Sequence, residues 1–192
     1  MYEEVKIKMI GEPPGLLMHN PRLADPLDEY AKALKKISGK RKKTEEDHIK
    51  MGNVEFLGSL YLDDDDNPVL TADIIHATLE NGAKNWKLGK VAKGAIQIFD
   101  DAVLSFSGPK DMEKRIEDPS CRLRKSVRVG QTRIIRTRPL FRNWSCVVPV
   151  MVDTARIERE QLIDIAEYAG RIIGVCDWRP RYGRFSVEVL NE

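Results

Sequence analysis

Alternation of apolar and charged side chains marks the strands expected at the two ends of the chain. Residues 5–10 alternate with a period of two, which is typical of a half-buried strand. Residues 144–152 are rich in valine and predict a second strand, in which Pro149 indicates an edge position or a bulge. Residues 185–190 predict the last strand.

Helical spacing of apolar residues recurs in four segments. The first is expected to begin at Asp25, an N-cap followed by proline, and to run to about Ile37. Residues 44–47 resemble a capping box that opens a second helix. The remaining two segments are 71–82 and the most regular one, 153–174, which ends at a glycine.

The middle of the chain carries the signals of short strands and of a hairpin. Short strands are expected over 95–99 and 102–106, followed by a polar connection over 108–119. Two strand-like runs then flank Gly130-Gln131, and a glycine followed by one further residue is the signature of a type II′ hairpin turn.

With the two early helices and the hairpin set aside, the elements follow the order β-α-β-β-α-β. This order is typical of the α+β ferredoxin-like, or RRM-like, fold, whose helices cover one face of an antiparallel sheet and leave the other free for a ligand. The sequence therefore predicts a single RRM-like domain over 1–192, with a helical insertion over 20–62 and an arginine-rich β-hairpin insertion over 120–140.

Composition narrows the classes of protein that are compatible with this pattern. A hydrophobic content of 42% supports a folded core. The three cysteines lie far apart, which argues against a disulfide framework and for a reducing compartment, and the histidines have no zinc-ligand spacing. No apolar run is long enough to cross a bilayer, and the polar start is unlike a signal peptide. We expect no cofactor, no metal and no membrane association.

Basic residues gather in one stretch although the net charge is only +2. Residues 121–152 contain no acidic side chain. Such an asymmetry of charge is expected where a surface meets a polyanion. Arginine suits this role because its guanidinium binds phosphate bidentately and stacks on bases. The alternative is a solvated ribbon whose arginines pair with the acidic turn 63–66 or with a neighbouring subunit. The basic residues of the stretch are Arg122, Arg124, Lys125, Arg128, Arg133, Arg136, Arg138 and Arg142.

Two further basic clusters are candidate nucleic-acid contacts. The loop near the C-terminus mixes cations with aromatic rings, as stacking platforms for single strands do, although its rings could instead fill the core. Its candidate residues are Trp178, Arg179, Arg181, Tyr182 and Arg184. The third cluster is a basic turn between the first two helices, which could also be merely solvated. It comprises Lys40, Arg41, Lys42 and Lys43.

The motifs of common enzyme classes are missing, so no catalytic residue is assigned. A P-loop, a dinucleotide fingerprint, a nucleophile elbow and a Cys-His pattern are all absent from the sequence. The run Asp63–Asp66 does not match an EF-hand loop. Metal-assisted cleavage of RNA by these aspartates, or general-base catalysis by His19, remain the catalytic alternatives.

Residues 174–185, with the sequence GVCDWRPRYGRF, resemble the glycine-rich loop of the RAMP superfamily. These RRM-fold proteins form the RNA-binding backbone of CRISPR effector complexes. Residues 66–75, leading into 82–84, are similar to the turn and first helix of that family, and the hairpin over 120–140 is similar to its thumb. The tail also resembles a pattern found in uncharacterised phage and prophage proteins.

The resemblance implies a non-catalytic, largely sequence-independent binder of RNA or single-stranded DNA. Such a protein would assemble as a homo-oligomer or with effector-complex subunits, in the cytoplasm of a bacterial or phage-infected host cell. One alternative is a metal- or histidine-dependent RNA endonuclease of the same fold. Another is a phage structural or anti-defence protein that binds an acidic protein partner.

Overall fold

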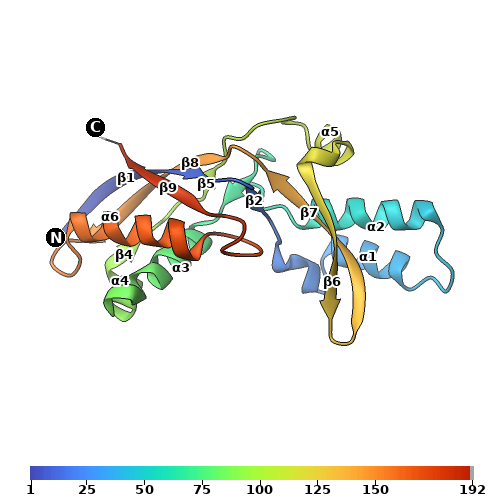
Figure 1. The fold of residues 1–192 in the computed structure, drawn as a ribbon, viewed down its shortest axis with the longest axis horizontal. Helices are drawn as coiled ribbons and strands as arrows, with labels where there is room; N and C mark the ends of the chain where they lie inside the picture. The colour runs from blue at the N-terminus through green and yellow to red at the C-terminus, as the bar shows by residue number, and fades with distance from the viewer. Residues whose placement is uncertain (191–192) are drawn as a thin grey trace. The chain divides into compact units, whose positions relative to one another are not determined.

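A computed structural model describes residues 1–190 and has the expected mixed α+β composition. The chain divides into two compact units (Figure 1). Unit 1 comprises Met1–Leu16, Tyr61–Ser107 and Phe141–Glu192, and unit 2 comprises Leu17–Leu60 and Gly108–Leu140. The two segments predicted as separate insertions therefore lie mostly in one unit, where they pack against each other.

Unit 1 is built on a four-stranded sheet with the order β4-β8-β1-β9, in which neighbouring strands are antiparallel. Its strands are β1 (Tyr2–Gly11), β4 (Ile96–Gln97), β8 (Ser145–Asp153) and β9 (Phe185–Val189). As the alternation in the sequence predicts, Val5, Ile7 and Met9 of β1 are buried on one face. They lie opposite the buried Val150, Val148 and Cys146 of β8.

Helices α3 (Ala72–Ala83), α4 (Gly89–Ala95) and α6 (Arg159–Tyr168) lie together on one side of this sheet (Figure 1). A small separate sheet joins β3 (Val69–Leu70) to β5 (Ala102–Val103). A short 3-10 helix, η2 (Lys84–Trp86), extends α3, and a π-helical segment, η4 (Ala169–Ile173), extends α6.

Pro149 does not lie on an edge strand, contrary to the prediction, because β8 is flanked by β4 and β1. It faces Lys6 of β1, whose carbonyl accepts a hydrogen bond from Leu190 and therefore points toward β9. The nitrogen of residue 149 thus points away from β1. On that side β4 pairs only with Val152 and Met151, so no ladder hydrogen bond is lost.

Several element boundaries differ from the prediction. Helix α1 begins at Glu29 with Asp28 as its N-cap, because Asp25 instead accepts the backbone N–H of Leu27 in a preceding turn. Helix α6 begins only at Arg159, because β8 continues to Asp153 and a turn over 154–158 separates the strand from the helix. The strands expected over 95–99 and 102–106 shrink to two residues each and belong to different sheets.

Unit 2 combines a pair of helices with a long β-hairpin. Its elements are η1 (Pro21–Ala24), α1 (Glu29–Ser38), α2 (Glu45–Gly58), α5 (Met112–Glu117), η3 (Pro119–Cys121), β6 (Arg122–Val129) and β7 (Thr132–Phe141). Strand β2 (Leu16–Leu17) completes a sheet with the order β2-β7-β6. The predicted capping box is present at the start of α2, where Thr44 and Asp47 exchange hydrogen bonds.

Helix α5 lies within the stretch predicted to be a polar connection. Asp111 caps it, and the buried Arg115 holds it in place by donating hydrogen bonds to the carbonyls of Leu140 at 2.8 Å and Pro109 at 3.1 Å. Such long-range contacts leave no periodic signal in so short a helix. Among the described residues, no helix is long and apolar enough to cross a membrane.

Candidate nucleic-acid interface

The basic hairpin forms at the predicted place as a regular two-stranded ribbon. Strands β6 and β7 pair from Arg122 opposite Pro139 to Val129 opposite Thr132. Gly130 has a φ of 60°, as the first position of a type II′ turn requires. The turn end of the ribbon extends past α1 (Figure 1), and Arg128 and Arg133 beside the turn are exposed.

The register divides the cations of the ribbon between its two faces, because directly opposed residues share a face and neighbours along a strand alternate. One face, which we call the arginine face, carries Arg122, Arg124, Arg128 and Arg133. The opposite face carries Lys125, Arg136 and Arg138.

Arg136, on the opposite face, is engaged within the unit. Its guanidinium forms an ion pair with Glu55 of α2, whose side chain is only 4% exposed. The same carboxylate accepts the backbone N–H of Thr137 at 2.8 Å. Glu55 therefore accepts a backbone hydrogen bond at the edge of β7, beyond the point where its pairing with β2 ends. Arg136 has a structural role that the sequence pattern did not reveal.

Cations of the arginine face have no such compensation. Within the described part of the chain, Arg124, Arg128 and Arg133 have no carboxylate at ion-pair distance, and Arg128 donates only to the carbonyl of Gly130. Arg128 and Arg133 lie directly opposite each other, an arrangement in which like charges repel. An anion bound between them would relieve this repulsion.

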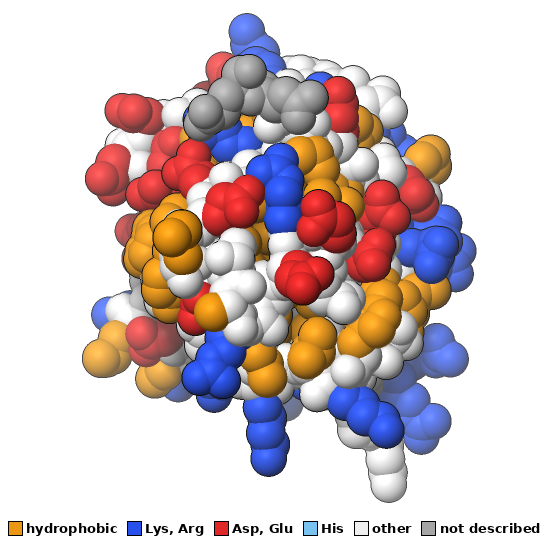
Figure 2. Space-filling view, turned by 90° about the vertical axis from the view of Figure 1, so that its left-hand side faces the viewer, with side chains coloured by type: hydrophobic (Ala, Val, Ile, Leu, Met, Phe, Trp, Pro, Cys, Tyr) orange, Lys and Arg blue, Asp and Glu red, His pale blue; other side chains and the backbone are white. Residues whose placement is uncertain are grey.

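Acidic residues of unit 2 are mostly used elsewhere. Asp28, Asp111 and Asp118 cap helices, and Asp47 joins the capping box of α2. Unit 2 contains 19 Lys and Arg residues against 11 Asp and Glu, which gives a formal charge of +8. Unit 1 contains 13 against 19, or −6, and acidic side chains gather on its face shown in Figure 2.

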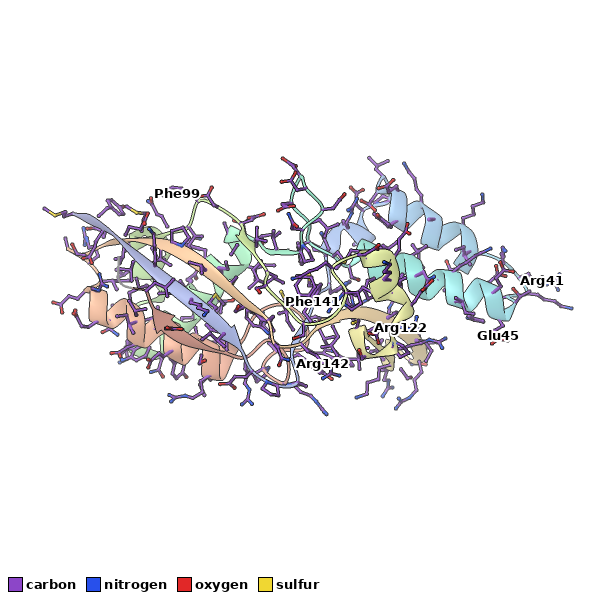
Figure 3. All side chains as sticks on the ribbon, turned by 90° about the horizontal axis from the view of Figure 1, so that it is seen from above. Arg41, Glu45, Phe99, Arg122, Phe141 and Arg142 are labelled. Atoms are coloured by element: carbon purple, nitrogen blue, oxygen red, sulfur yellow. The ribbon has the colours of Figure 1, made fainter. Side chains whose placement is uncertain are left out.

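The basic turn between α1 and α2 is only partly free. Lys40 donates to the carboxylate of Asp47 at 2.6 Å, and Lys43 donates to the carbonyl of Lys40 at 3.0 Å. Arg41 and Lys42 are exposed, and Arg41 lies at the tip of the helical pair and points away from it (Figure 3). Two of the four predicted contacts thus stabilise the turn itself.

The Lys40 ammonium and the backbone N–H of Thr44 hold the pKa of Asp47 below its ordinary value. Because the pKa of Asp47 is lower in the folded protein than in the unfolded chain, the ionised carboxylate stabilises the fold at pH values above the pKa of the unfolded chain. This stabilisation is lost as the pH falls through the pKa of the folded protein. We expect Asp47→Asn to destabilise the protein at neutral pH and the gap to wild type to narrow in acid. Urea unfolding at both pH values measures this, and an equal gap at both would contradict it.

In unit 1, the loop 174–184 is held in a defined shape. Gly174, Cys176, Trp178 and Gly183 have positive φ, and the N–H of Gly183 donates to Gly15 at 2.9 Å. This places the loop beside residues 12–15, where Arg142 donates to the carbonyl of Pro14. The structure therefore groups Arg142 with the C-terminal loop and not with the ribbon.

Side chains of this loop differ in their access to a ligand. Tyr182 is 7% exposed and its ring centroid lies 6.0 Å from that of Trp178, which is 37% exposed. Trp178 is thus the more accessible of the two rings. Arg179 and Arg181 are exposed, whereas the Nε of Arg184 lies 3.5 Å from a carboxylate oxygen of Glu12.

The sheet face opposite the helices is unlike a stacking platform. Lys6 and Lys8 of β1 form ion pairs there with Glu4 and Glu188. Apart from Tyr2 at the end of β1, neither central strand carries an aromatic residue. Base stacking on this face, as in RNA-recognition modules, therefore has no support in the side chains present.

The catalytic alternatives gain no geometric support. Asp63 binds its own turn by accepting the N–H groups of Asp65 and Asn67, and no three His, Cys, Asp or Glu side chains among the described residues form a metal-binding group. His19 is exposed between β2 and η1. Burial raises the pKa of the Cys146 and Cys176 thiols to about 12, which keeps both protonated at neutral pH.

Two features of the interface were not anticipated, and one of them was accessible from sequence. The two-residue turn at Gly130-Gln131 fixes the register, so the opposition of Arg128 and Arg133 follows from it. The partnership of Glu55 with Arg136 leaves no such local signal.

Neither a protein-family model nor a curated protein matches this chain.

Proposed function

We propose that this protein is a non-catalytic, sequence-tolerant nucleic-acid-binding protein that grips a phosphate backbone with the arginine face of its β-ribbon. One observation carries the proposal: Arg128 and Arg133 oppose each other on an exposed face without a carboxylate partner among the described residues. A phosphate between the two guanidiniums would convert mutual repulsion into two charge-assisted hydrogen-bonding interactions.

The distribution of charge in unit 2 supports the same conclusion. Its excess of cations attracts any polyanion, and phosphate contacts carry no sequence information. Arg41 and Lys42 offer further contacts at the tip of the helical pair. RNA or single-stranded DNA remains the proposed ligand, with Trp178 available in unit 1 for stacking on a base.

We expect the double substitution Arg128→Glu/Arg133→Glu to weaken binding of a labelled oligonucleotide at least tenfold. The slope of log affinity against log salt should fall by about 0.7 for each lost contact with a single strand. Fluorescence anisotropy over a salt series measures both quantities. Lys90→Glu/Lys93→Glu makes the same change in charge at exposed positions of unit 1 and serves as the matched control.

A specific interface requires the ribbon variant to lose far more affinity than the control. Equal losses in the two variants would mean that only the overall charge matters, and the arginine face would then have no special role. Unchanged affinity in the ribbon variant would exclude it as the binding surface. A competing explanation, in which the arginines protect an edge strand from aggregation, predicts loss of solubility without loss of affinity.

We also infer that unit 1 is a ferredoxin-like domain related to the RAMP superfamily. The strand order β4-β8-β1-β9 with antiparallel neighbours supports this, because it corresponds to the second, third, first and fourth strands of a β-α-β-β-α-β chain. The loop 174–184 lies between the last helix and the last strand, as the glycine-rich loop of that superfamily does. Assembly on a bound strand, with further copies or with effector subunits, belongs to the same proposal.

A further inference from the structure

An exposed isoleucine lies in the middle of the arginine face. Ile135 is directly opposite Ser126, and half of its surface is exposed. Its same-face neighbours are Arg133 and Thr137 along β7, with Arg124 and Arg128 diagonally across on β6. Three of the five neighbours of this apolar side chain are therefore arginines that have no carboxylate partners among the described residues.

Single exposed apolar residues are common on protein surfaces and carry no meaning by themselves. The surroundings of Ile135 are what give it meaning. A strand whose phosphates contact the flanking arginines would bring its sugars and bases over the space between them, and the aliphatic side chain is the group that occupies that space. Bases of an unpaired strand have accessible faces, whereas those of a duplex are stacked on their neighbours.

We infer that Ile135 contacts the bases of a bound single strand while Arg124, Arg128 and Arg133 contact its phosphates. The inference rests on the proposed function, since it assigns a ligand class to the same surface. According to this inference, the affinity has two parts that differ in their dependence on salt. Arginine contacts release counterions and depend on salt, whereas an apolar contact removes surface from water and does not.

The test compares two labelled probes, an oligothymidylate and an oligomer of equal length in which every base is absent. We expect the wild type to prefer the oligothymidylate. Ile135→Thr keeps a β-branched side chain suited to a strand. It should lower affinity for the oligothymidylate about fivefold, because part of the apolar surface of the isoleucine is lost from the contact with the bases. Affinity for the abasic oligomer and the salt slope should not change.

Leu27→Thr is the matched control, because Leu27 is 76% exposed in the same unit but lies outside the ribbon. It should leave both affinities unchanged. If the wild type binds neither probe, the proposed function itself fails. If the wild type binds both probes equally and Ile135→Thr changes neither affinity, the surface binds phosphates alone and the role of Ile135 is refuted. Equal losses on both probes also refute it, by assigning Ile135 a structural role.

Discussion

Gly183→Ala is expected to abolish stable folding of unit 1. A Cβ at this position would lie 1.9 Å from the carbonyl oxygen of Val175 and 2.9 Å from its carbonyl carbon, and the φ of 75° is one that side chains rarely adopt. Val175 cannot withdraw, because it is fully buried and its N–H donates to the carbonyl of Gly183 at 2.9 Å. We expect a loss of about 4 kcal/mol or more, at the upper end for single substitutions.

Two other glycines separate the causes of this effect. Gly130 shares the positive φ but has no atom near its added Cβ, so Gly130→Ala should cost about 1 kcal/mol from backbone strain alone. Gly94 has open space and ordinary helical backbone, so Gly94→Ala should be neutral or slightly stabilising. Urea unfolding followed by far-UV circular dichroism measures all three, and equal losses for Gly183→Ala and Gly130→Ala would disprove the clash.

Glu55→Ala is expected to cost about 3 kcal/mol in the unfolding free energy of unit 2. The substitution leaves the backbone N–H of Thr137, a residue only 1% exposed, without its acceptor, and removes the partner of the Arg136 guanidinium. Glu55→Gln keeps an acceptor oxygen in place and should recover part of the loss. The difference in unfolding free energy that remains between Glu55→Gln and the wild type measures the contribution of the charge, separately from that of the hydrogen bond.

The control for Glu55 lies on the same helix. Glu46 forms an exposed pair with Lys50, so Glu46→Ala should change stability little. Unfolding should be followed by far-UV circular dichroism, because the segments 17–60 and 108–140 contain no tryptophan. Equal effects of the two substitutions would show that burial adds nothing to the Glu55 pair.

Local chemistry accounts for the elements that could be predicted from sequence. The alternation in β1, the capping box at Thr44 and the turn at Gly130-Gln131 each depend on neighbours a few residues away, and all three are present. The loop after α6 also contains the positive φ at Gly183 that its glycine allows.

Contacts between distant segments account for what could not be predicted. Glu55 and Arg136 are 81 positions apart, so neither residue signals the other in the sequence. The short α5 owes its position to Arg115, whose acceptor Leu140 is 25 positions away. The same limit applies to the candidate site: the cluster of arginines was visible, but which of them are used within the fold depended on the tertiary partners.

The opposite charges of the two units affect how the protein behaves among its own copies. At low ionic strength the cationic unit of one molecule attracts the anionic unit of another. The net charge of +2 alone would predict no such attraction between copies. Added electrolyte screens that attraction, and it would screen the proposed contacts with phosphates in the same way. The buffers that best keep the protein dispersed would therefore also weaken the polyanion binding that we propose.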